Sequence, residues 1–173
     1  MRAQQVKKQA EEPFSNTPVP SPHDVAARFV LGQVSARTPW WAAQWLTDGR
    51  DSEALREMAG LNGRDTRALA DLLPTVLAEM GVDPLPGTLE AVTMVFRNIA
   101  ADCLTGRLDE RAVVQHVEEI VISHDYASEI TDLPLGLLYG LDDEWQGGWG
   151  ATVEQLRATV RARCTDQLAQ SPT

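Results

Sequence analysis

The strongest constraint on the fold of this chain is an apolar pattern with helical spacing. In residues 88–104 the apolar side chains follow one another at intervals of three, four, three and four residues: Leu89, Val92, Phe96, Ile99 and Cys103. This spacing places them on one face of an α-helix and is typical of the packing seam of a helical bundle. The sequence therefore predicts a long helix here that packs against at least one other helix.

Helix-start and helix-stop residues delimit further helices along the chain. A Ser, Thr or Asp that can cap a helix N-terminus precedes most of the apolar stretches, and a glycine follows most of them. The helices predicted in this way occupy residues 21–32, 38–49, 51–60, 65–81, 88–106, 109–124 and 152–168. Pro74 lies inside one of these segments and predicts a kink or a break between Leu72 and Thr75. Residues 125–150 contain five glycines and are expected to be irregular or to form short helices.

No segment alternates apolar and polar residues for long enough to predict a strand, so the expected fold class is all-α. With 173 residues, of which 43% are hydrophobic and 23% charged, the chain fits one globular domain. We expect a single domain of six to eight helices over residues 21–173, in an orthogonal or bundle-like array. Residues 1–20 combine charged residues, Gln, Ser and Pro without apolar periodicity, which predicts a flexible, disordered tail.

The expected compartment follows from what the chain lacks. Its apolar runs are shorter than the ~18 residues that cross a bilayer, and MRAQQVKKQAEEP has no apolar core of a signal peptide. These features predict a cytoplasmic protein that does not associate with membranes. Cys103 and Cys164, the two cysteines, both lie on apolar helical stripes, which indicates buried and reduced thiols.

Negative charge is concentrated in one third of the chain. Residues 102–154 contain 12 acidic and two basic residues, a net charge of −10, which equals the net charge of the whole chain. Such a segment repels phosphate backbones, so direct binding to nucleic acid is not expected, whereas a basic protein partner would be attracted. The alternative interpretation is a solvated acidic surface that only keeps the protein in solution.

Within this acidic third, one segment combines carboxylates with large aromatic side chains. The candidate partner-binding residues are Asp142, Asp143, Glu144, Trp145 and Trp149, and they lie in a glycine-rich setting. Tryptophan is over-represented at the energetic centres of protein interfaces, and acidic residues around it would select a basic partner. The alternative is a capped turn in which Trp145 packs on the core and the acids stabilise a helix N-terminus.

A different hypothesis rests on the dipeptide His124-Asp125 at the end of a predicted helix. It resembles the signature pair of the HD-domain family of metal-dependent phosphohydrolases, which is also all-α. The resemblance implies a further His upstream and a further Asp downstream. The sequence offers His116 or His23 for the first and Asp142 or Asp143 for the second. Neither histidine has the spacing of that family, so no residue is assigned here as catalytic or as a metal ligand.

In composition, and in the phrases Gly-Arg-Asp and Leu-Asp-Asp-Glu, the chain resembles small acidic α-helical proteins of actinobacteria, some of which are immunity proteins. The leading hypothesis is a non-enzymatic protein-binding module, of immunity or regulatory type, that engages a basic protein partner through an acidic surface. It needs no cofactor and no metal. The alternative is a metal-dependent hydrolase of HD type. The sequence carries no prediction of the oligomeric state.

Overall fold

The computed structural model describes residues 18–170, and within them all regular secondary structure is helical, without a strand. The all-α prediction is confirmed. The first half contains α1 (Pro22–Val30), α2 (Thr38–Thr47), α3 (Glu53–Gly60) and α4 (Thr66–Glu79). The second half contains α5 (Thr88–Leu104), α6 (Glu110–Ser123), α7 (Ser128–Thr131), the 3-10 turn η1 (Gly136–Leu138), α8 (Leu141–Gly147) and α9 (Val153–Ala169).

The described residues thus form nine α-helices where six to eight were expected. The difference comes from residues 125–150, which form two short α-helices and a 3-10 turn. The predicted flexible tail, residues 1–20, falls almost entirely on residues 1–17, which lie outside the described residues.

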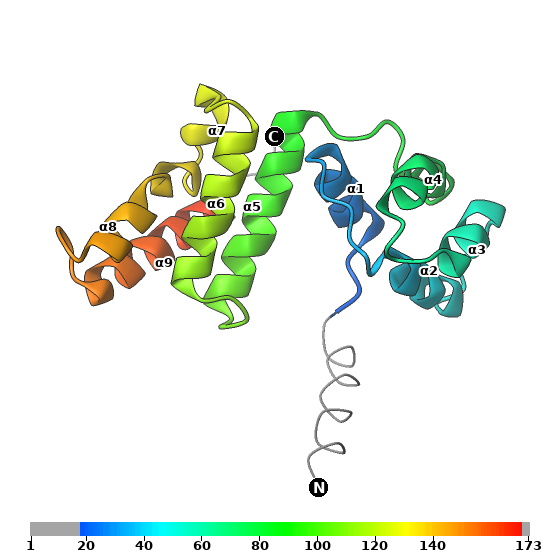
Figure 1. Cartoon of the computed structure of the whole chain (residues 1–173), viewed down its shortest axis with the longest axis horizontal. Coiled ribbons are helices and arrows are strands. Elements are labelled where there is room, and N and C mark those ends of the chain that lie inside the picture. Colours follow the sequence, from blue (N-terminus) through cyan, green and yellow to red (C-terminus); the bar gives the residue numbers. More distant parts are fainter. Residues whose placement is uncertain (1–17, 171–173) are drawn as a thin grey trace, which may run out of the picture.

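Two hydrophobic clusters occupy the two halves, which lie side by side in Figure 1. The cluster of α1–α4 is built from buried aliphatic and sulfur-containing side chains and one tryptophan. Its largest members are Trp45, Leu55, Met58, Leu69, Leu73 and Leu77. The cluster of the second half lies between α5, α6 and α9, with α7 and η1 closing one end. Its largest members are Phe96, Ile99, Ile120, Ile130, Leu135 and Leu138.

The predicted seam on α5 is confirmed for four of its five residues. Val92, Phe96, Ile99 and Cys103 are buried, and Phe96 has no exposed surface. Leu89, in the first turn of the helix, is 40% exposed. The buried state predicted for both cysteines is also confirmed, and burial raises the pKa of Cys164 to about 12.

Helix α1 joins the two halves. Its Val25 and Ala26 belong to the first cluster, whereas Ala27, one residue further, is fully buried in the second. Close to this junction the Asn98 side chain on α5 donates a hydrogen bond of 2.7 Å to the Asp24 carboxylate on α1. Because successive residues of one helix contribute to both clusters, the two halves pack against each other through α1.

Helix α4 departs from the sequence prediction at Pro74. The helix is continuous from Thr66 to Glu79, so of the predicted kink or break between Leu72 and Thr75 the break is absent. Leu73, Val76 and Leu77 around the proline are fully buried, and their packing offsets the lost hydrogen bond to the Ala70 carbonyl. Among the described residues, no helix combines the length and the apolar character needed to cross a membrane.

Candidate functional site

The segment predicted to bind a partner forms α8, a helix of seven residues between two glycines in the left-handed conformation. Gly140, before the helix, has a φ of 84° and Gly148, after it, a φ of 61°. Both values suit glycine, which lacks a Cβ. Asp142, Asp143 and Glu144 occupy the first turn, where the positive end of the helix dipole stabilises negative charge.

Asp142 is turned into the protein. Its side chain is only 5% exposed, and it accepts a hydrogen bond of 3.0 Å from Nε of Arg111 on α6 and another from the Gln146 amide. Burial acts to raise the pKa of Asp142, but the hydrogen bonds from Gln146 and Arg111 outweigh it, and the pKa is lowered. Asp142 therefore fastens α8 to α6.

Of the other four predicted residues, two are half-buried and two are exposed. Trp145 is half-buried against the second hydrophobic cluster, and Glu144 is half-buried with its carboxylate 3.4 Å from the Ala151 amide nitrogen. Asp143 is exposed, and Trp149 is 61% exposed. The Trp149 indole lies against Gly147, where a Cβ would collide with it. The structure thus leaves Asp143 and Trp149 available at the surface.

Two tyrosines that the sequence analysis did not select lie on the same side of the second half. Tyr126 follows α6 and Tyr139 follows η1, and their side chains are 54% and 44% exposed. Their ring centroids are 5.5 Å apart with an interplanar angle of 75°, an edge-to-face arrangement. The pair forms because the chain folds back between the two residues, and no local sequence pattern reports such a contact.

The backbone before this pair is in an uncommon conformation. Asp125 and Tyr126 have φ values of 52° and 57°, the left-handed region that non-glycine residues seldom adopt. The Tyr126 N–H donates to the Val121 carbonyl at 3.0 Å, which ends α6 with a tight reversal. Residues held in such conformations cluster at functional sites, where they present a side chain in a fixed direction. Here the reversal directs Tyr126 toward Tyr139.

Two carboxylates act electrostatically on the tyrosine pair. The pKa of Glu118 on α6 is raised first by burial and then by the negative charges of Asp142 and Asp143. The pKa of Tyr139 is raised by its hydrogen bond with Tyr126 and by burial, and further by the charges of Tyr126, Glu118 and Asp143. Glu118 and Asp143 therefore both act on the same small region of the surface.

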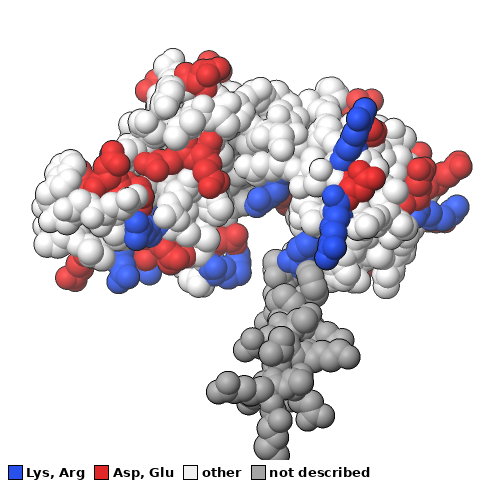
Figure 2. Space-filling view, viewed as in Figure 1, with Lys and Arg blue, Asp and Glu red and all other residues white. Residues whose placement is uncertain are grey.

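A shallow groove of about 510 Å³ continues this region along α6. Its lining residues share one face of the helix: Gln115, Glu118, Glu119, Ile122 and Ser123. Ile122 is 52% exposed, so the groove offers an apolar contact next to the carboxylates of Glu118 and Glu119. We call Glu118, Ile122, Tyr126, Tyr139 and Asp143 together the acidic tyrosine surface. Figure 2 shows several groups of acidic side chains on this half of the molecule.

Each of the histidines considered for a metal site has different surroundings. His124 Nδ1 is 2.9 Å from the Ile120 carbonyl oxygen within the last turn of α6. His116 Nδ1 is 3.7 Å from the Glu119 carboxylate, and His23 is exposed on α1. Within residues 18–170, no three His, Cys, Asp or Glu side chains are grouped so that they could hold a metal ion.

The chain was compared with family models, with curated proteins and with solved structures, and none of the three comparisons gives a match. The chemistry of the site is therefore argued from its own geometry.

Proposed function

We propose that this chain is a protein-binding module, of immunity or regulatory type, which engages a basic protein partner through the acidic tyrosine surface. The observation that carries the proposal is the exposed Tyr126–Tyr139 pair, in a part of the surface where the negative charges of Glu118 and Asp143 act on Tyr139. Tyrosine supplies a large contact area at a low cost in side-chain entropy and is enriched among the residues that dominate binding energy.

The chemistry of this surface suits an Arg or Lys side chain of the partner. The faces of the tyrosine rings attract cations, and the carboxylates of Glu118 and Asp143 provide negative charge at the same place. Ile122 offers an apolar contact for the aliphatic stem of such a side chain. The excess of acidic residues around the surface raises the rate of encounter with a basic partner.

The structure changes which residues should be tested. Asp142 was predicted to face the partner, but its replacement would remove a buried ion pair and disturb the fold. The informative double variant is Glu118→Gln with Asp143→Asn. A matched control is Glu57→Gln with Asp71→Asn, which removes two exposed acids from α3 and α4. Trp149→Ala tests the remaining exposed member of the predicted set.

The experiment is affinity purification with the wild-type chain and both double variants as bait, followed by binding kinetics with the captured partner at two ionic strengths. We expect Glu118→Gln with Asp143→Asn to lower the association rate and its dependence on salt, and the control to leave both unchanged. Tyr126→Ala should weaken binding by about 2 kcal/mol or more, mainly through faster dissociation.

Two outcomes would contradict the proposal. If the surface variant and the control variant capture the same proteins with the same kinetics, the acidic tyrosine surface is not the interface. If Tyr126→Ala binds as the wild type does while thermal melting shows that it is folded, the tyrosine pair does not anchor the partner.

A further inference from the structure

The two cysteines of the chain meet in the second hydrophobic cluster. Cys103 lies in the last turn of α5 and Cys164 in the second half of α9, and these two helices pack against each other. Both side chains are buried free thiols, and a hydrogen bond joins them. Two cysteines that are far apart in the sequence are thus brought together in the core.

The hydrogen bond makes the two thiols chemically unequal. The Cys164 S–H donates to the Cys103 sulfur, which favours the thiolate form of Cys103. Burial raises the pKa of Cys103, and the hydrogen bond with Cys164 acts in the opposite direction. Burial raises the pKa of Cys164 to about 12, and the negative charge and hydrogen bond of Cys103 add to this effect. Cys103 therefore ionises before Cys164, and the thiolate is the form that reacts with oxidants.

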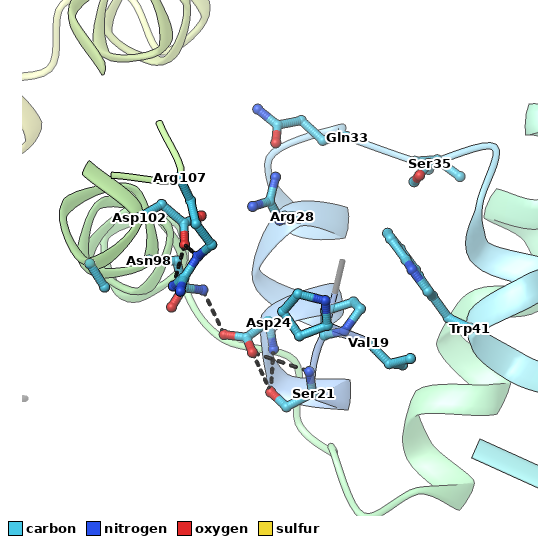
Figure 3. A pocket seen from close by; sticks show the side chains of 14 residues that line it. Val19, Ser21, Asp24, Arg28, Gln33, Ser35, Trp41, Asn98, Asp102 and Arg107 are labelled. Carbon is cyan, nitrogen blue, oxygen red and sulfur yellow. Dashed lines mark hydrogen bonds and ion pairs between the residues drawn. The ribbon is translucent and has the colours of Figure 1, made fainter. Parts of the chain in front are cut away.

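Solvent comes close to the thiols at the end of α5. A cleft of about 820 Å³ lies between the two halves, and Ala101 and Asp102 of α5 line it (Figure 3). Cys103 follows these residues directly and is turned into the cluster. Asp102 and Arg107 form an exposed ion pair of 2.7 Å across the end of the helix. Because helix ends open more easily than helix centres, a small solute in the cleft needs only one opened turn to reach Cys103.

We propose that Cys103 and Cys164 are a redox pair that hydrogen peroxide converts into a disulfide between α5 and α9. Peroxide enters through the last turn of α5. The Cys103 thiolate attacks one peroxide oxygen, so an S–O bond forms, the O–O bond breaks, and the other oxygen leaves as water with the proton of the Cys103 thiol. The Cys164 sulfur then attacks the sulfenic sulfur of Cys103. The S–S bond forms, the S–O bond breaks, and the second oxygen leaves as water with the proton of Cys164. The two thiols thus lose two electrons, and peroxide is reduced to two molecules of water.

The disulfide closes a loop that contains the acidic tyrosine surface. The chain between Cys103 and Cys164 includes α6, α7, η1 and α8, and with them all five residues of that surface. A disulfide across such a loop restricts the unfolded chain. Oxidation should therefore raise the melting temperature, by about 5 to 15 °C for a chain of this length. The redox pair shares no residue with the surface and does not depend on the function proposed for it.

The test treats the folded full chain with hydrogen peroxide and follows its mass and its non-reducing peptide map. We expect the loss of two hydrogen atoms, one cross-linked peptide pair that contains Cys103 and Cys164, and return of both thiols with dithiothreitol. In Cys164→Ala, dimedone should trap a sulfenic acid at Cys103. In Cys103→Ala, dimedone should label Cys164 about tenfold or more slowly. Circular dichroism shows whether both variants are folded, and the wild-type map requires no substitution.

A matched pair of variants tests the route of entry. Arg107→Gln breaks the ion pair with Asp102 at the end of α5, and Arg56→Gln breaks the comparable exposed pair with Asp51 beside α3. We expect Arg107→Gln to form the disulfide about two- to fivefold faster than the wild type, and Arg56→Gln to form it at the wild-type rate. Equal rates in the two variants would overturn entry through the last turn of α5.

The redox pair itself is overturned by any of three results. These are a folded wild type that keeps both thiols in peroxide, disulfides that form only between chains, and equal dimedone labelling of the two folded single variants. A melting temperature that is unchanged or lower in the oxidised chain would overturn the effect on the loop.

Discussion

At the scale of single residues, neighbouring acids in α8 have opposite roles. Asp142 is buried and bound to Arg111 and Gln146, whereas Asp143 is exposed. Successive residues of an α-helix point about 100° apart, so Asp142 points into the protein whereas Asp143 points toward solvent. The composition of the segment could not distinguish the two, because a carboxylate that pairs with a residue 31 positions away leaves no local pattern.

The two acids make a matched pair for a stability measurement. Asp142→Asn should lower the free energy of unfolding by about 1 to 2 kcal/mol, because Arg111 loses a charged partner that is partly screened by solvent. Asp143→Asn should change it by less than about 0.5 kcal/mol. Urea unfolding monitored by circular dichroism at neutral pH measures both values. Equal effects of the two substitutions would contradict the assigned roles.

The same pair has a defined dependence on pH. The pKa of Asp142 is below its ordinary value of 3.8 in the folded chain, so the unfolded chain takes up its proton first. The stabilisation by the carboxylate is complete above this ordinary value and is lost as the pH falls through the folded-state pKa. The difference in stability between the wild type and Asp142→Asn should therefore shrink only in acid.

At the scale of elements, α5 carries the second hydrophobic cluster, and Phe96 is its largest fully buried side chain. Phe96→Ala should reduce the free energy of unfolding by about 3 to 5 kcal/mol, since it removes apolar contacts and leaves a cavity. Leu104→Ala, at the exposed end of the same helix, should cost less than about 1 kcal/mol. Thermal or urea unfolding provides the measurement, and similar losses for the two variants would show that the cluster is not centred on α5.

Local signals were sufficient for the long helices. The caps predicted at Ser21, Asp65, Asp109 and Thr152 are present, because a cap depends on residues within one turn of each other. The starts predicted at Asp51 and Thr88 are each wrong by one residue, since Ser52 caps α3 and α5 follows Gly87 without a side-chain cap. The apolar spacing likewise identified the buried face of α5, with Leu89 as the exception. These are the parts of the fold in which sequence neighbours determine the structure.

Elements that depend on distant contacts were not predictable in the same way. The continuous path of α4 through Pro74 depends on the packing of Leu73 and Leu77 against α1 and α3. The Tyr126–Tyr139 pair depends on a chain reversal in which Asp125 and Tyr126 are left-handed. Asp and Tyr in a sequence do not indicate such a reversal. The candidate surface therefore follows from the three-dimensional path of the chain between α6 and α8 and could not be predicted from the sequence.

At the scale of the whole molecule, stability depends on whether the two clusters unfold together. Helix α1 places Val25 and Ala26 in one cluster and Ala27 in the other, and the Asp24–Asn98 hydrogen bond reinforces the same junction. A shared helix makes each cluster lose contacts when the other unfolds. This coupling predicts one cooperative transition for the wild-type chain.

Ala27→Glu tests this coupling, because it buries a carboxylate against α5 at a position that has no exposed surface. We expect the two halves to unfold at different free energies in this variant. The amides of α2–α4 should exchange with solvent at a lower free energy than those of α5, α6 and α9, because the second hydrophobic cluster is larger. His23→Glu, on the exposed side of α1, should leave a single transition, since its charge favours the helix N-terminus. Hydrogen exchange followed by mass spectrometry in increasing urea resolves the two halves. Two transitions already present in the wild type, or a single unchanged transition in Ala27→Glu, would show that α1 does not couple the clusters.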